Sequence, residues 1–155
     1  MAKYTAQIAW QRTQSEQFVD QKYSRAHTWI FDGGIKVAAS SSPSIVPLPY
    51  SNPDNVDPEE AFVTSLSSCH MLFFLHFAAK SGLTVDTYID HAEGMMANNA
   101  QGKLAMTKVI LNPNVTWSNK SVVSSTMTDE LHHQAHEACF LANSVHTNIV
   151  ICSQS

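Results

Sequence analysis

The apolar pattern is strongest over residues 57–82, where it predicts one long buried helix. Apolar side chains recur there at helical spacing, and the second half of the segment is apolar on nearly every side. Asp57 is a good N-cap, Pro58 suits the first helical position, and Glu60 stands three residues after the cap, as in a capping box. Gly82 is a typical stop signal. A helix of this kind must be covered by the rest of the chain.

The same helix carries a cysteine, Cys69, near its middle. We do not expect the helix to span a membrane, because its apolar stretch is short and polar side chains interrupt it. The interrupting residues are Ser65, Ser67, Ser68, His70 and His76.

Strands are predicted before this helix. Alternating apolar and polar residues indicate a half-buried strand over residues 4–10. Residues 27–31 and 35–39 are predicted to pair as a hairpin, because the Asp32-Gly33-Gly34 sequence between them favours a tight turn. The proline-rich residues 40–57 are predicted to form an ordered loop without regular structure.

After the helix, strands are predicted over residues 84–93 and 103–117, with a polar turn at 98–102 between them. Pro113 predicts that the second strand is bent or at an edge. A second helix is expected to start at Thr128 as its cap and to end near Cys139, followed by a short strand over 145–151. The predicted fold is α+β: one domain, residues 1–155, with a curved, mainly antiparallel sheet around the central helix.

Composition narrows the functions that fit this fold. The chain has 155 residues, of which 44% are hydrophobic and only 14% are charged, so we expect part of its surface to be buried against another subunit. A formal net charge of −4 and the lack of a Lys/Arg cluster argue against nucleic acid or an anionic membrane as partner. The first residues lack an apolar leader, which favours a cytoplasmic protein, and an odd number of cysteines there does not predict a structural disulfide framework.

The candidate chemistry is that of thiols. A lone cysteine in an apolar helix is usually a small buried side chain, but Cys139 at a helix end could act as its partner in a peroxide-reactive pair. Cys69 must be a thiolate to react, and burial alone would raise its pKa. A nearby arginine would compensate, and of the two arginines, Arg12 and Arg25, the second stands beside a predicted strand.

That arginine would need a carboxylate of its own. Glu60 is engaged in the capping box, so Glu59 is the available partner for Arg25. On a straight helix, however, Glu59 lies about 15 Å along the axis from Cys69. A site that uses both requires either a break in the helix at residues 65–68 or a carboxylate from a second subunit.

Motifs along almost the whole chain, in the same order, resemble those of the OsmC/Ohr family of osmotically inducible and organic hydroperoxide resistance proteins. The motifs are YSRAHTW at 23–29, FDGG at 31–34, DPEEAF at 57–62, SSCHM at 67–71 and AHEAC at 135–139. The resemblance implies an intertwined homodimer with sites at the subunit interface, and reduction of organic hydroperoxides by thiols without a cofactor.

By motif position, Cys69 resembles the peroxidatic cysteine, Cys139 the resolving cysteine, Arg25 the activating arginine and Glu59 the carboxylate that holds it. An external dithiol would regenerate the enzyme after a Cys69–Cys139 disulfide has formed. Phe140 follows Cys139 where many members of the family have proline. His70 likewise follows Cys69 where an apolar residue is common, so the match is nearer to an OsmC-like branch.

The sequence also suggests residues for the substrate pocket and two alternative functions. Phe62, Met71 and Phe73 around the first cysteine are expected to favour a bulky organic peroxide over hydrogen peroxide. One alternative is a non-catalytic dimer that binds a small apolar ligand, with an inert Cys69. Another is a zinc site on the late helix, formed by residues at helical spacing on one face. Its ligands would be His132, His136 and Cys139.

Overall fold

The computed structural model describes residues 1–118 and 122–154. Internal contacts divide the chain into two compact units, Met1–Ala61 and Phe62–Ser155. Helix α1 (Pro58–Lys80) begins at the end of the first unit and runs through the second.

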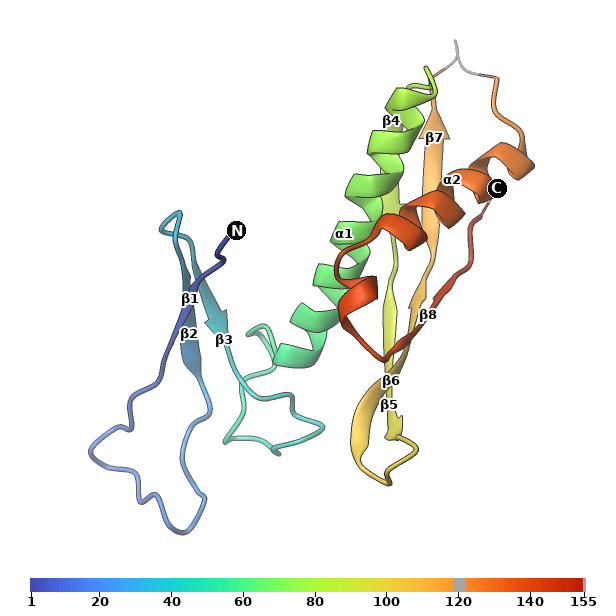
Figure 1. Cartoon of the computed structure of the whole chain (residues 1–155). Helices are drawn as coiled ribbons and strands as arrows, with labels where there is room; N and C mark the ends of the chain where they lie inside the picture. The colour runs from blue at the N-terminus through green and yellow to red at the C-terminus, as the bar shows by residue number, and fades with distance from the viewer. Residues whose placement is uncertain (119–121, 155) are drawn as a thin grey trace. The chain divides into compact units, whose positions relative to one another are not determined.

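The first unit contains a three-stranded antiparallel sheet of β1 (Ala6–Ala9), β2 (His27–Phe31) and β3 (Lys36–Ala39), in that order (Figure 1). The predicted hairpin is confirmed, and its turn depends on Gly34, whose φ of 86° is in the region that glycine favours. The first strand is shorter than residues 4–10. The proline-rich segment forms no helix or strand and reaches α1 through backbone hydrogen bonds to β3.

Both predicted ends of α1 are confirmed. The Asp57 N–H donates to Glu60 Oε2 at 3.0 Å, and the Glu60 N–H donates to Asp57 Oδ1 at 2.7 Å, which is a capping box. At the other end, Gly82 has a φ of 74° and its N–H donates to the Ala79 carbonyl, while the Leu83 N–H donates to the Ala78 carbonyl. These two bonds form a Schellman motif, which ends the helix.

Helix α1 is unbroken and, by length and composition, long and apolar enough to cross a membrane, with a mean hydropathy of 1.4. The expectation that it is too short to do so is therefore wrong. The core helix of a soluble protein meets the same criteria, and α1 is such a core helix by its packing: one side chain per turn is fully buried. These buried residues are Leu66, His70, Phe74 and Ala78.

The second unit packs two small sheets and a second helix around α1. Strand β4 (Val85–Asp90) pairs with β7 (Pro113–Trp117), and β5 (Glu93–Asn98), β6 (Leu104–Leu111) and β8 (Asn148–Ile151) form the other sheet. Among the described strands the pairings are antiparallel, except that β6 and β8 are parallel. Helix α2 is Ser125–Ala138, and a 3-10 turn, Ala142–Ser144, follows it.

Several predicted boundaries in this unit are wrong. The strand expected over 84–93 ends at Asp90, β5 was not predicted, and the strand expected over 103–117 is divided at Asn112. Asp90 Oδ1 accepts a hydrogen bond from the Asn112 N–H at 2.6 Å, and the Asn112 side chain donates to the His91 carbonyl at 2.9 Å. Such side-chain bonds to the backbone compete with ladder bonds. The cap of α2 is Ser124, whose hydroxyl accepts from the Met127 N–H, and Thr128 lies inside the helix.

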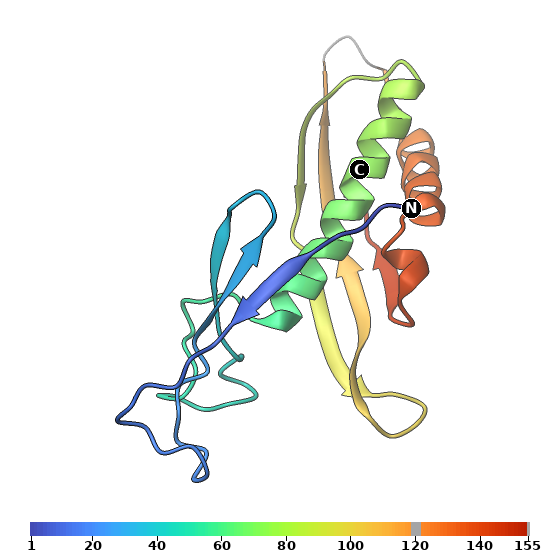
Figure 2. The ribbon, with the colours of Figure 1, turned by 60° about the vertical axis from the view of Figure 1, so that its left-hand side comes forward.

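The core follows the length of α1. In its second half, Phe74 and Ala78 pack against Leu131 and Ala135 of α2 and against side chains of β4 and β7. Figure 2 shows α1 between these strands and α2. In its first half, Leu66 packs against residues of β6 and β8. The unit is therefore two small cores joined by one helix.

Gly94 of β5 lies close to α1. A Cβ at this position would lie 2.6 Å from Val63 Cγ2 and 2.7 Å from Met106 Sδ. Contacts this short require these side chains, or the elements that carry them, to shift.

We expect Gly94→Ala to lower the free energy of unfolding by about 1–3 kcal/mol, as is usual for overpacked cores. Urea denaturation followed by circular dichroism would measure the change. Gly33→Ala is the matched control, because a Cβ at that position meets nothing within 4 Å. Equal effects of the two substitutions would contradict the close approach at Gly94.

Candidate functional site

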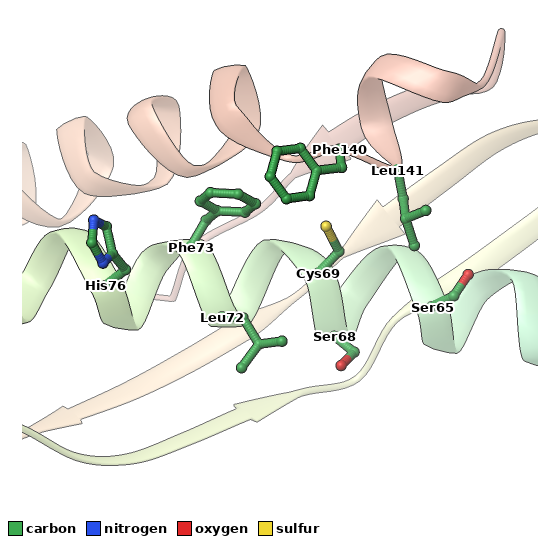
Figure 3. Close-up of a pocket in the computed structure, with 8 residues that line it drawn as sticks. All are labelled: Ser65, Ser68, Cys69, Leu72, Phe73, His76, Phe140 and Leu141. Carbon is green, nitrogen blue, oxygen red and sulfur yellow. The ribbon is translucent and has the colours of Figure 1, made fainter. Parts of the chain in front are cut away.

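Cys69 lies in a pocket of about 590 Å³ in the second unit. Most of the pocket wall comes from one face of α1, and the rest from the two residues that follow Cys139. In Figure 3 the Cys69 sulfur and the rings of Phe73 and Phe140 point toward one another. The lining residues are Ser65, Ser68, Cys69, Leu72, Phe73, His76, Phe140 and Leu141.

Cys139 is the C-cap of α2 and its thiol is buried, with 1% of the residue exposed. Its Sγ accepts a hydrogen bond from the Ala142 N–H at 3.4 Å. The Cys69 thiol lies close enough to affect the ionisation of Cys139. The structure thus brings together the two cysteines that the sequence pointed to, and both are free thiols.

The two thiols are not equivalent. Burial, and next the neighbouring Cys69 thiol, raise the pKa of Cys139 to about 11, although the Ala142 N–H acts in the opposite direction. Cys139 is therefore protonated at neutral pH. Cys69 is also the more exposed of the two.

The pocket around Cys69 is apolar and open. Leu72 and Phe140 are 61% and 71% exposed, and the Phe140 ring meets Phe73 edge-on with centroids 5.0 Å apart. Exposed apolar side chains around a thiol leave space for an apolar ligand or a covering surface.

Only one of the three predicted pocket residues lines this pocket. Phe73 does so, whereas Phe62 packs against the core residue Leu66. Met71 is not part of the wall because it lies two positions after Cys69, about 200° around the helix axis. The helical spacing of apolar residues alone did not distinguish pocket residues from core residues.

Most residues that line the Cys69 pocket were not predicted from the sequence. The α1 members lie one, three, four or seven positions from Cys69, so counting helical spacing outward from this cysteine would have found them. Phe140 and Leu141 follow the end of α2, where no periodic signal exists.

Arg25 and Glu59 line a second pocket, of about 440 Å³, in the first unit. The Arg25 guanidinium donates to the carbonyls of Gln21, at 2.8 Å, and Tyr23, and its Cζ lies 3.7 Å from the centroid of the Tyr23 ring. The other lining residues are Ile8, Trp10, Phe18, Tyr23, His27, Ser41 and Pro58.

Arg25 and Glu59 line the same pocket but form no ion pair within one chain. Both residues lie within the part of the chain that the structure describes, and no ion pair links them. The guanidinium instead uses backbone carbonyls and an aromatic ring. The helix break at residues 65–68, one of the two ways in which Glu59 could share a site with Cys69, is excluded because α1 is continuous.

A buried hydrogen bond joins the two helices beside the cysteines. His70 Nε2 and His132 Nδ1 are 3.0 Å apart, and the two residues are 1% and 3% exposed. Burial is the main cause that lowers the pKa of each histidine to about 4. For His70, the charges of His132 and His136 act in the same direction; for His132, the carboxylates of Asp129 and Asp90 oppose it.

This arrangement corrects the zinc prediction. His132 is hydrogen-bonded to His70, and Cys139 is at the end of α2 next to Cys69. Over residues 1–118 and 122–154 there is no group of three or more metal-ligating side chains that could hold an ion.

The fold and the thiol pair place the chain in a known class. A family model described as OsmC-like protein matches residues 51–153, and the chain belongs to this family. A comparison with curated proteins gave no match.

The solved structures agree with this assignment. An OsmC-like protein of unknown function from Vibrio cholerae O1 biovar eltor strain N16961 is 51% identical, with a TM-score of 0.97, over 99% of this chain and 100% of that one. An organic hydroperoxide resistance protein from Elizabethkingia anophelis shares the fold at 17% identity, with a TM-score of 0.67 and coverage of 98% and 95%. The organic hydroperoxide resistance protein OhrB of Bacillus subtilis, also 17% identical, has a TM-score of 0.61 and coverage of 97% of both chains.

The buried histidine pair predicts a loss of stability in acid. The folded-state pKa of each histidine, about 4, lies below the unfolded value near 6.5, so the unfolded chain takes up protons first as the pH falls. Stability should therefore be complete above about pH 6.5 and should fall toward pH 4, by up to about 1.4 kcal/mol per pH unit for each histidine. Urea denaturation at several pH values measures the slope.

Carboxylates also titrate in this range, so the slope must be compared between variants. The double variant His70→Phe/His132→Phe should have a shallower slope than the wild type, while His133→Phe, on the exposed face of α2, should keep the wild-type slope. A double variant with an unchanged slope would show that the pair does not carry the effect.

Proposed function

We propose that the protein is a dithiol-dependent organic hydroperoxide reductase, which reduces organic hydroperoxides to alcohols in oxidative stress defence. The observation that carries this proposal is the buried Cys139 thiol next to Cys69, which lines an apolar pocket. Relatives of the same fold that are named organic hydroperoxide resistance proteins support it.

In the first step, the Cys69 thiolate attacks the terminal oxygen of ROOH. The O–O bond breaks and its electron pair leaves as RO⁻, which takes a proton to give the alcohol, while Cys69 becomes a sulfenic acid. The high pKa of Cys139 keeps its proton in place during this step. Cys69 therefore reacts in this step, and Cys139 stays protonated.

In the second step, Cys139 attacks the Cys69 sulfur, the S–O bond breaks, and hydroxide leaves and is protonated to water. After burial, the neighbouring Cys69 and its charge also raise the pKa of Cys139. Oxidation of Cys69 to an uncharged sulfenic acid removes that charge, so the resolving thiol becomes easier to deprotonate when it is needed. An external dithiol then reduces the disulfide by exchange.

The pocket suits an organic peroxide better than hydrogen peroxide. Leu72, Phe73, Phe140 and Leu141 offer apolar surface to an alkyl or aromatic group next to the Cys69 sulfur. Burial of such a group contributes roughly 25 cal/mol per Å² of apolar surface, which hydrogen peroxide lacks.

The activating residues come from a second copy of the chain. Glu59 precedes Cys69 by about 15 Å along an unbroken helix, so a compact site within one chain is unfavourable. The exposed apolar residues around Cys69, and the aromatic wall that surrounds Arg25, are surfaces that a homodimer would cover. In the dimer, the Arg25 of one chain stabilises the thiolate and the departing alkoxide of the other, and Glu59 orients it.

No cofactor is needed, and the expected location is the cytoplasm, where dithiol reductants are available. Nucleic acid and membranes are not partners in this proposal, in keeping with the net charge of −4.

The two cysteines should have separable roles. Consumption of an organic hydroperoxide with a dithiol reductant should be lost in Cys69→Ser, whereas Cys139→Ser should complete one stoichiometric turnover and then stop. Cys152→Ser, which removes an exposed thiol, is the matched control and should turn over like the wild type. A mass increase of one oxygen on Cys69 in Cys139→Ser would identify the sulfenic acid.

A wild type that consumes no hydroperoxide would refute this activity. The pocket would then be assigned to the non-catalytic alternative, a dimer that binds a small apolar ligand beside an inert Cys69.

Mixed dimers test whether the arginine acts across the interface. Cys69→Ser and Arg25→Gln should each be inactive alone. Unfolded and refolded together in equal amounts, they should recover roughly a quarter of wild-type activity, because half of the dimers carry one site with both native residues. Recovery would be absent if each chain supplied its own arginine. Arg12→Gln, which alters the other arginine, is the control and should remain active.

A further inference from the structure

We propose that the His70–His132 hydrogen bond is a positioning device that sets the register of α2 against α1, and so holds Cys139 on Cys69. Its catalytic consequence, control of the resolving step, rests on the function proposed above. Neither histidine touches the substrate in this scheme.

The His70–His132 hydrogen bond is held in place by ring packing and is shielded from solvent. The two imidazole rings are nearly parallel, with an interplanar angle of 7° and centroids 5.3 Å apart, and Phe74 stacks on His132 at 4.3 Å. Both histidines are almost completely excluded from solvent. A hydrogen bond that water cannot reach is directional and costly to break.

The remaining contacts between the helices do not fix their register. Phe74 and Ala78 of α1 meet Leu131 and Ala135 of α2, which is apolar packing between partly small side chains. Such packing holds the helices together but is not directional. Among the described residues, His70–His132 is the hydrogen bond that joins α1 to α2.

The positions of the histidines connect this bond to the thiols. His70 follows Cys69 directly on α1, and His132 lies seven residues, or two turns, before Cys139 on the same face of α2. A slide of α2 by one residue would move Cys139 by about 1.5 Å along the axis. Because a disulfide needs Cβ atoms about 3.5–4.5 Å apart and a defined dihedral angle, such a slide would prevent the two sulfurs from joining.

The two chemical steps should respond differently to loss of the bond. Attack of Cys69 on a peroxide uses no reacting atom of α2, although Phe140 and Leu141, which follow α2, line the pocket. Disulfide formation requires the sulfur of Cys139 and therefore depends directly on the register of α2. A merely structural role would lower stability without this separation.

Disulfide closure can be measured without peroxide chemistry. Diamide takes two hydrogen atoms from a thiol pair and leaves a disulfide. In a Cys152→Ser background, we expect His132→Phe to close the Cys69–Cys139 disulfide roughly 10- to 100-fold more slowly than the wild type. Phenylalanine keeps a ring against Phe74 but cannot accept or donate the hydrogen bond.

Three further variants make the test specific. His132→Asn places an amide atom near the position of Nδ1 and should restore most of the rate. His133→Phe makes the same change one residue away, on the exposed face, and should have no effect. His70→Phe/His132→Phe removes both partners, so no buried polar group is left unpaired, and should be slow even if His132→Phe folds poorly.

The same proteins are then given an organic hydroperoxide. Slow disulfide closure with a normal rate of sulfenic acid formation supports the proposal. Wild-type closure in both His132→Phe and the double variant would overturn it, as would a His132→Asn variant as slow as His132→Phe. If the wild type closes with diamide but never consumes hydroperoxide, the proposed function fails while the positioning role is still decided by the diamide rates.

Discussion

Everything in the second unit depends on the burial of one helix. Helix α1 is apolar on several faces, so it cannot be stable until strands and a second helix cover it. The cover is supplied by two separate cores, one at each half of the helix. Cys69 and His70 lie between these cores and face different partners. The packing that the apolar surface demands is therefore also what brings the late helix, with Cys139 at its end, to the thiol.

The chemistry of the site depends on a difference between its two thiols. Two identical functional groups lie in contact, but one is buried and keeps its proton, whereas the other opens onto a pocket. The difference in burial is enough to distinguish them. The arginine and carboxylate that the family resemblance associates with these thiols lie in a pocket of the first unit. In the proposed mechanism, a second subunit brings these two residues to the thiols.

Much of the fold could be predicted from local signals, and much of the site could not. The limits of α1, the β2–β3 hairpin and the helix end at Cys139 follow from caps, turn residues and apolar spacing, which act over a few residues. The division of the later strands depends on Asn112 binding Asp90 and His91 across the fold, which no local pattern reveals. The cysteine pair was predictable because both residues have a distinct chemistry. The His70–His132 contact was not, because it joins residues of two helices that only tertiary packing brings together.

The place of Cys139 at the end of α2 has a mechanical consequence. Its backbone ends the helix, its sulfur is tied to the Ala142 N–H, and a single short turn follows. Because Cys139 lies just beyond the last residue of α2, a disulfide to Cys69 forms without breaking the hydrogen bonds inside the helix. The register of α2 still sets where the sulfur lies, so oxidation and reduction exchange only the S–S bond while the rest of the unit keeps its packing.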